Sequence, residues 1–270
     1  MSYKCLLLSF FLSITISASE SKKAEDESQT WIDFKETVSL FAKGSYTQFQ
    51  TKSNLAYAAA AAPVVWYSFE NDKRIQARYG GTEIKNIVDH VGDAGVIFNF
   101  PIIPIGFYYY GRKNNNNHHI QFAKEYLAAM YLTLAETGIM SYFYVHSRPV
   151  TGDESFWETE FRGKSSWPSG HVVPYMTLFF KTLQFYGPAY ATAPFVLTVM
   201  SSMQRMQDNK HWLSDITMSF FLSAWASEGV RKAAGYKKNH PFYRWVFEND
   251  ASLSLLRYQN SVGPKLSWTF

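Results

Sequence analysis

The sequence predicts an all-α fold made of a single helical-bundle domain. Composition is the first reason: the 270 residues are 47% hydrophobic and 18% charged, which supplies the core of one large domain. Pattern is the second, because from Trp31 onward apolar segments of helical length are separated by clusters of Gly, Pro and Asn. No window shows the sustained alternation that is typical of strands. The aromatic content of 18% further predicts dense packing.

The N-terminus has the pattern of a cleaved signal peptide over residues 1–19. Lys4 precedes an apolar stretch, residues 5–16, and small residues follow at 17–19. An uncleaved anchor is the alternative, although the stretch is shorter than the roughly 20 residues of a spanning helix. Cys5 is the only cysteine, so a mature chain would carry no disulfide and no cysteine metal ligand. We expect an exported protein of a bacterial periplasm; an inner-membrane protein whose functional site faces the periplasm is the alternative.

The remaining chain divides into a polar leader and a helical domain. Residues 20–30 are polar and of mixed charge, which predicts a flexible leader before a domain at 31–270. Pro101 and Pro104 must kink or break the apolar segment that contains them. The expected helical segments are 55–69, 94–110, 122–145, 171–186, 189–203 and 211–230.

Residues 94–110 and 126–145 approach the length of a membrane span. Residues 126–145, however, include Glu136, and the segment from residue 171 includes Lys181. Each charge inside a span costs about 2.5–3.5 kcal/mol on insertion scales. A helical bundle in water is therefore the preferred interpretation, and contact with a membrane surface stays open.

The net charge argues against nucleic-acid binding, and the adjacent pair of histidines argues against a metal site. Lys and Arg number 26 against 22 Asp and Glu, and this weak, dispersed net charge of +4 does not predict nucleic-acid binding. His118 and His119 stand in an Asn-rich connection at 111–119. Adjacent residues rarely converge on one ion, so the connection is expected to be a solvated loop and no metal site is predicted.

Three motifs carry chemistry, and we name motif 1 residues 146–149, motif 2 residues 168–171 and motif 3 residues 205–215. In motif 3, His211 and Asp215 are four residues apart, so on a helix the carboxylate can accept a hydrogen bond from one ring nitrogen. The bond fixes the tautomer and leaves the other nitrogen as a lone-pair donor, which suits a nucleophile or a base. Taken alone, this spacing is more typical of a surface pair.

Motif 2 reads Pro-Ser-Gly-His before an apolar helix. Backbone amides at a helix N-terminus bind anions, and Gly170 allows a ligand to approach the backbone closely. His171 is then placed to give a proton to a departing oxygen. Arg148 in motif 1 and Arg205 in motif 3 add guanidinium groups suited to phosphate oxygens. Together the motifs predict a site at converging helix ends.

The three motifs resemble the signature of one superfamily. Its members are type 2 phosphatidic acid phosphatases, bacterial non-specific acid phosphatases and vanadium haloperoxidases. The family pattern is Lys-x6-Arg-Pro, then Pro-Ser-Gly-His, then Ser-Arg-x5-His-x3-Asp. Order and spacing match over residues 141–215.

The resemblance implies a phosphatase that hydrolyses phosphomonoesters through a phosphohistidine, with no metal and no cofactor. His211 would be the nucleophile, Asp215 would hold it in place, and His171 would be the general acid. The implied phosphate-binding residues are Arg148, Arg205, Ser169 and Gly170. The substrate would be a phosphorylated small molecule or a lipid or isoprenoid phosphate. A vanadate-dependent haloperoxidase and a non-catalytic envelope protein that retains the fold are the alternatives.

Two positions depart from the family pattern. Ser141 stands where the family has lysine, and Gln204 stands where it has the serine before the arginine. Lys164, in the loop before motif 2, is the first candidate to replace the missing charge, and Lys210 is the second. On this hypothesis Ser141→Lys raises activity if the pocket has room for it, and Lys164→Ala lowers activity.

Overall fold

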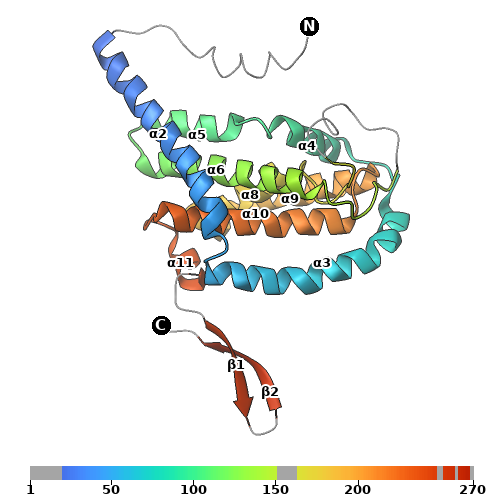
Figure 1. The fold of residues 1–270 in the computed structure, drawn as a ribbon. Helices are drawn as coiled ribbons and strands as arrows, with labels where there is room; N and C mark the ends of the chain where they lie inside the picture. Colours follow the sequence, from blue (N-terminus) through green and yellow to red (C-terminus); the bar gives the residue numbers. More distant parts are fainter. Residues whose placement is uncertain (1–19, 151–162, 248–251, 259–260, 268–270) are drawn as a thin grey trace. The chain divides into compact units, whose positions relative to one another are not determined.

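The computed structural model describes residues 20–150, 163–247, 252–258 and 261–267, so the predicted signal peptide at 1–19 lies outside the described residues. The chain divides into two compact units, Met1–Glu36 and Thr37–Phe270. The described helices confirm the predicted all-α class, and one hairpin accompanies them (Figure 1). The elements are α2 (Glu20–Thr47), α3 (Lys52–Tyr79), α4 (Asn86–Ile97), α5 (Ile102–Lys113), α6 (Asn117–Met140), α8 (Val173–Tyr186), α9 (Pro188–Gln207), α10 (Leu213–Ala234), α11 (Pro241–Phe247), β1 (Ser252–Tyr258) and β2 (Ser261–Ser267).

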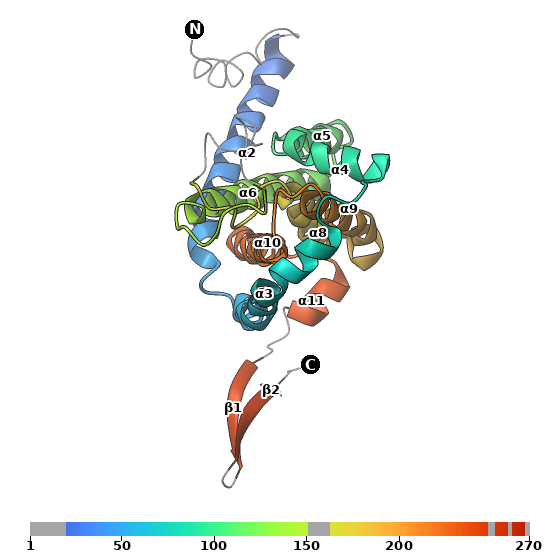
Figure 2. The same ribbon diagram turned by 90° about the vertical axis from the view of Figure 1, so that its right-hand side faces the viewer.

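Helix α10 lies at the centre of the larger unit, where it packs against α3, α6 and α8. Figures 1 and 2 show α6 and α3 on opposite sides of α10. Small side chains allow the close approach, since Ala128 and Ala129 of α6 face Ala226 and Val230 of α10 in one buried cluster. Aromatic side chains fill the next space, where Phe122 of α6 joins a second cluster with α8. This packing fixes the start of α10, which carries motif 3.

The predicted break at the prolines is confirmed. Helix α4 ends at Ile97, α5 begins at Ile102, and the two are bent by 76°. Pro101 precedes α5, and Pro104 stands in its first turn, where a helix tolerates proline because the amide would be unpaired anyway. Among the described helices, none is by itself long and apolar enough for a membrane span, whereas α4 and α5 together reach that length and hydropathy as a bent pair.

Two expected loop segments are helical instead. Residues 20–30, expected to be a flexible leader, form the first turns of α2. The side chain of Asn116 accepts hydrogen bonds from the backbone amides of His118 and His119 and so starts α6 earlier than predicted. The two rings then pack inward. His118 Nδ1 lies 2.8 Å from the Tyr236 hydroxyl, and burial lowers the pKa of His118.

The C-terminal segment differs most from the prediction. No sustained alternation predicted strands here, yet β1 and β2 form an antiparallel hairpin, with Ser252 opposite Ser267 and Tyr258 opposite Ser261. Leucines alternate with serines over only the first four residues of β1, which is too short a pattern to separate from a loop.

The charges that argued against membrane spans are found inside the bundle. Lys181 of α8 is fully buried, and its Nζ donates to Glu125 at 2.7 Å and to Gln184 at 2.6 Å. Burial lowers the pKa of Lys181, and the Glu125 carboxylate opposes that shift. A buried charge of this kind is stabilised only when its partner is present.

Glu136 gives a stability prediction. Burial raises its pKa from 4.5 to about 7, although Gln48 donates to its carboxylate at 2.6 Å. The unfolded chain loses this proton near pH 4.5 and the folded chain keeps it to about pH 7, so the folded state binds more protons in that window. The free energy of unfolding therefore falls as pH rises from about 4.5 to 7, by at most about 3 kcal/mol. Denaturant titrations at pH 5 and pH 8 should show this loss, and Glu136→Gln should reduce it; an unchanged pH dependence in the variant would contradict the assignment.

Candidate active site

The three motifs lie at helix ends and are joined by hydrogen bonds. Motif 1 follows α6, motif 2 precedes α8, and motif 3 runs from the end of α9 into α10. The guanidinium of Arg148 donates to the carbonyl of Lys210 at 3.3 Å, which ties motif 1 to motif 3. The amide of Ser169 donates to the carbonyl of Asp215 at 3.3 Å, which ties motif 2 to the same helix. These hydrogen bonds join segments up to 62 residues apart into one site.

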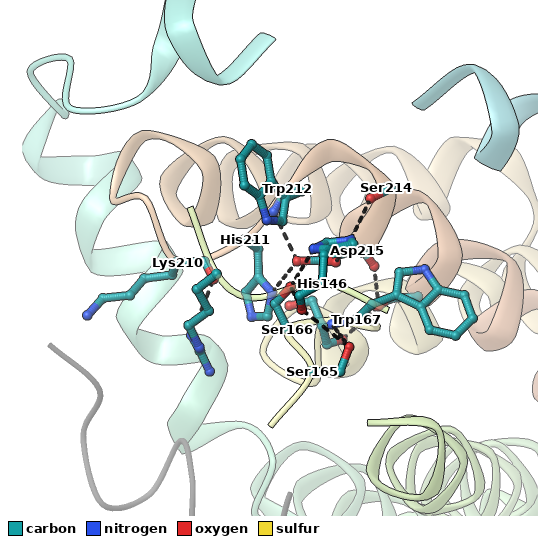
Figure 3. A network of polar contacts seen from close by, with 12 residues as sticks. His146, Ser165, Ser166, Trp167, Lys210, His211, Trp212, Ser214 and Asp215 are labelled. Carbon is teal, nitrogen blue, oxygen red and sulfur yellow. Dashed lines mark hydrogen bonds and ion pairs between the residues drawn. The ribbon is translucent and has the colours of Figure 1, made fainter. Parts of the chain in front are cut away.

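His211 and Asp215 form the buried pair that their spacing predicts. His211 Nδ1 lies 3.0 Å from Asp215 Oδ2, and neither side chain is exposed (Figure 3). His211 precedes α10, however, and Asp215 reaches back from the first turn, where its Oδ2 also accepts from the backbone amide of Trp212 at 3.0 Å. The Asp215 carboxylate therefore both caps the helix and orients the His211 ring. With the proton on Nδ1, the lone pair of His211 is on Nε2.

Motif 2 is placed differently from the prediction. Helix α8 begins at Val173, so His171 lies in the turn before the helix rather than in its first turn. The amide of Ser169, expected to bind a phosphoryl group, donates to Asp215, and the carbonyl of Ser169 accepts from Ser219 at 2.7 Å. His171 is nearly buried, and its carbonyl packs so tightly on α4 that a Cβ at Gly95 would lie 2.7 Å from it.

The two predicted phosphate-binding arginines are both buried, at 8% and 4% exposure. Arg205 lies in the last turn of α9, and its carbonyl accepts from the amide of His211 at 3.2 Å. Its guanidinium lies 3.6 Å from Asp208 and 3.9 Å from Asp93. Buried guanidinium groups held by carboxylates are fixed forks for an anion, although these acids also reduce the local positive charge.

The comparison with known proteins identifies the region that contains this site. Residues 122–237 match the family model of the PAP2 superfamily. The similarity to this superfamily is thus found in that region. The region includes all three motifs, the helices α8, α9 and α10, and α6 from Phe122 onward. No curated protein and no solved structure gave a significant match. The family supports a phosphatase-type activity.

The departure from the family pattern at Gln204 has a visible structural consequence. Gln204 is buried, its Oε1 accepts from Arg205 Nε at 2.6 Å, and its amide donates to Asp89 at 3.1 Å. A side chain at Gly92 of α4 would occupy the space that Gln204 fills. The longer residue thus links Arg205 to the acidic face of α4.

Ser141, the other departure, is fully buried at the end of α6. Its hydroxyl donates to the Gly138 carbonyl at 2.6 Å and accepts from the Gly163 amide at 2.8 Å. The Ser141 carbonyl accepts from the Ser165 amide at 3.2 Å. The serine therefore anchors the loop that leads into motif 2.

Lys164 is better placed than Lys210 to supply the charge of the family lysine that Ser141 replaces. Lys164 is exposed and stands between Gly163 and Ser165, the two residues that bind Ser141. The side chain of Lys210 extends away from His211 (Figure 3). The geometry favours Lys164 as the replacement, and its contact with phosphate stays a prediction.

The expectation that Ser141→Lys raises activity is not supported, because the position has no room. We expect Ser141→Lys to destabilise the fold by about 2–4 kcal/mol, since it overpacks the helix end and buries an ammonium without a partner. Ser141→Ala should cost about 1–2 kcal/mol through the two lost hydrogen bonds. Thermal unfolding of both variants measures this, with exposed Ser28→Ala as the control. A Ser141→Lys variant as stable as the native chain would contradict it.

His146 is the site residue whose contacts the sequence did not predict. Its ring lies between Ser166, at 3.0 Å from Nδ1, and Ser214 and Asp215, at 3.3 Å and 3.4 Å from Nε2. The only sequence signal was its place in motif 1, two residues before Arg148.

Proposed function

We propose that this chain is a phosphomonoester hydrolase that forms a phosphohistidine on His211. The observation that carries the proposal is the buried His211–Asp215 pair, with Nδ1 and Oδ2 3.0 Å apart. An oriented imidazole of this kind is an activated nucleophile, because the carboxylate stabilises the positive charge that develops on the ring during attack.

In the proposed reaction, His211 Nε2 attacks phosphorus and the bond to the leaving oxygen breaks. His171 gives its proton to that oxygen. His171 then accepts a proton from water, the water oxygen attacks the phosphohistidine, and inorganic phosphate leaves. Arg148, Arg205 and Lys164 provide the charge that stabilises the phosphoryl oxygens. Since the first step requires one neutral and one protonated histidine, we expect a bell-shaped pH profile whose apparent pKa values belong to the coupled pair.

We propose further that the substrate is a phosphorylated lipid or isoprenoid. The support is the segment between Ser141 and motif 1, in which Tyr142, Phe143 and Tyr144 are each 67–70% exposed. Aromatic side chains beside a phosphate site suit an apolar substrate tail or a membrane surface, because they combine a large apolar face with polar edges.

One assay series tests the activity. Purified protein is given a soluble aryl phosphate, with and without EDTA, and then a long-chain alkyl phosphate in mixed micelles. We expect turnover that EDTA leaves unchanged and that orthovanadate inhibits, and a higher kcat/KM for the long-chain ester. Absence of phosphate release would refute the proposed phosphatase activity of this fold. Halide oxidation by peroxide after addition of vanadate would favour the haloperoxidase alternative.

A further inference from the structure

Gln204 connects Arg205, one of the two arginines of the candidate site, to helix α4. Its Oε1 accepts from Arg205 Nε at 2.6 Å. Its Nε2 donates to Asp89 at 3.1 Å and to Asp93 at 3.4 Å. Gln204 is 1% exposed and Arg205 is 4% exposed. A buried amide with partners on both sides keeps one orientation, because turning it would leave buried polar groups without hydrogen bonds.

The chemistry of the neighbours determines which way the Gln204 amide points. A guanidinium only donates hydrogen bonds, and an ionised carboxylate only accepts them. The oxygen of Gln204 must therefore face Arg205, and its NH₂ group must face the carboxylates of α4. A glutamate at this position would turn an acceptor toward the same carboxylates, and the serine of the family pattern is too short to bridge the two groups.

Helix α4 has the shape to receive this side chain. Gly92 and Gly95 are both buried and stand three residues apart on one face of the helix. A Cβ at Gly92 would overlap the amide of Gln204, and a Cβ at Gly95 would lie 2.7 Å from the carbonyl oxygen of His171. Helix α4 lies outside residues 122–237, the region that is similar to the PAP2 superfamily. An element outside that region thus packs directly on two of the motifs.

We propose that Gln204 is a positioning residue for Arg205 and that α4 holds it in place. With Nε bound to Gln204, the guanidinium can bind phosphoryl oxygens only through its terminal nitrogens, which suits a bidentate contact. Asp208 and Asp93 lie 3.6 Å and 3.9 Å from Nη2, so Gln204 makes the shorter contact and sets the orientation. That the positioned arginine binds phosphate rests on the proposed function; the contact between Gln204 and Arg205 does not.

Two substitutions disturb this contact from opposite sides. Gln204→Met keeps the length of the side chain and removes its hydrogen bonds. Gly92→Ala leaves the glutamine in the chain and displaces it with a methyl group on α4. The matched controls are Gln207→Met, in the same last turn of α9, and Gly106→Ala on α5, where a Cβ would have no atom within 4 Å. Thermal unfolding of each variant verifies that it is folded.

The first measurement is hydrogen exchange of the arginine side chains, followed by ¹H–¹⁵N NMR. The Nε–H signal of Arg205 is assigned by its loss in Arg205→Lys. We expect slow exchange in the wild-type protein, because this N–H is buried and bound, and exchange at least about tenfold faster in Gln204→Met and Gly92→Ala. The controls should exchange as wild type does. An unchanged rate in Gln204→Met would overturn the proposal, whether or not the protein is a phosphatase.

The second measurement is the Kd of inorganic phosphate by calorimetry. We expect it to rise about tenfold in Gln204→Met and in Gly92→Ala, since a guanidinium without a fixed orientation loses its bidentate geometry. Serine leaves room for the methyl group, so Gly92→Ala should have no further effect in a Gln204→Ser background. Native phosphate affinity in both single variants would refute the positioning role. A wild-type protein that binds no phosphate would refute the proposed function instead, and the exchange rates would then decide the contact.

Discussion

Replacing His211 with alanine is expected to reduce phosphate release at least about 10⁴-fold, because no other group then forms the covalent intermediate. His211 is fully buried, and its backbone amide donates to the Arg205 carbonyl. The backbone between α9 and α10 should therefore keep its conformation when the imidazole is removed. The remaining arginines would still bind substrate, and KM should change much less than kcat. His118→Ala, at a histidine bound to Tyr236 in another part of the bundle, is the matched control.

The covalent intermediate gives a sharper test of the same variant. Rapid acid-free quenching of wild-type protein with ³²P-labelled substrate should trap a phosphoenzyme that is labile to acid and stable to base. His211→Ala should trap none. A phosphoenzyme of normal yield in His211→Ala would place the nucleophile elsewhere and remove the main support for the proposed function.

The contact between His211 and Asp215 could be predicted because it is local. Four residues separate the two, and a helix was expected to place them on one face. The structure reaches the same contact by another route, since His211 stands outside α10 and Asp215 at the third helical position reaches back to it. The predicted partners were right, and the predicted helix boundary was two residues too early.

The surroundings of this pair could not be predicted from local patterns. Asp72 binds Ser214 from 142 residues away, and His146 meets Asp215 across 69 residues. Such contacts depend on how α3 and the loop after α6 pack on α10, and periodicity within one segment carries no information about that packing. Ser141 illustrates the same limit: the sequence showed that a lysine was missing, and only the fold showed that the position is closed.

Asp215→Asn is expected to lower kcat by about 10³-fold while the helix start is retained. The asparagine oxygen can still accept from the Trp212 amide, so the N-terminal cap of α10 survives and the unfolding temperature should fall only slightly. The neutral amide cannot stabilise a positive charge on His211 as the carboxylate does. We therefore expect the pH profile to change along with the rate, which a loss of packing alone would not cause. Glu70→Gln, an exposed carboxylate on α3, is the control for charge removal. A variant that is stably folded and as active as wild type would show that Asp215 does not orient His211, and the nucleophile would have to be activated by other groups around the site.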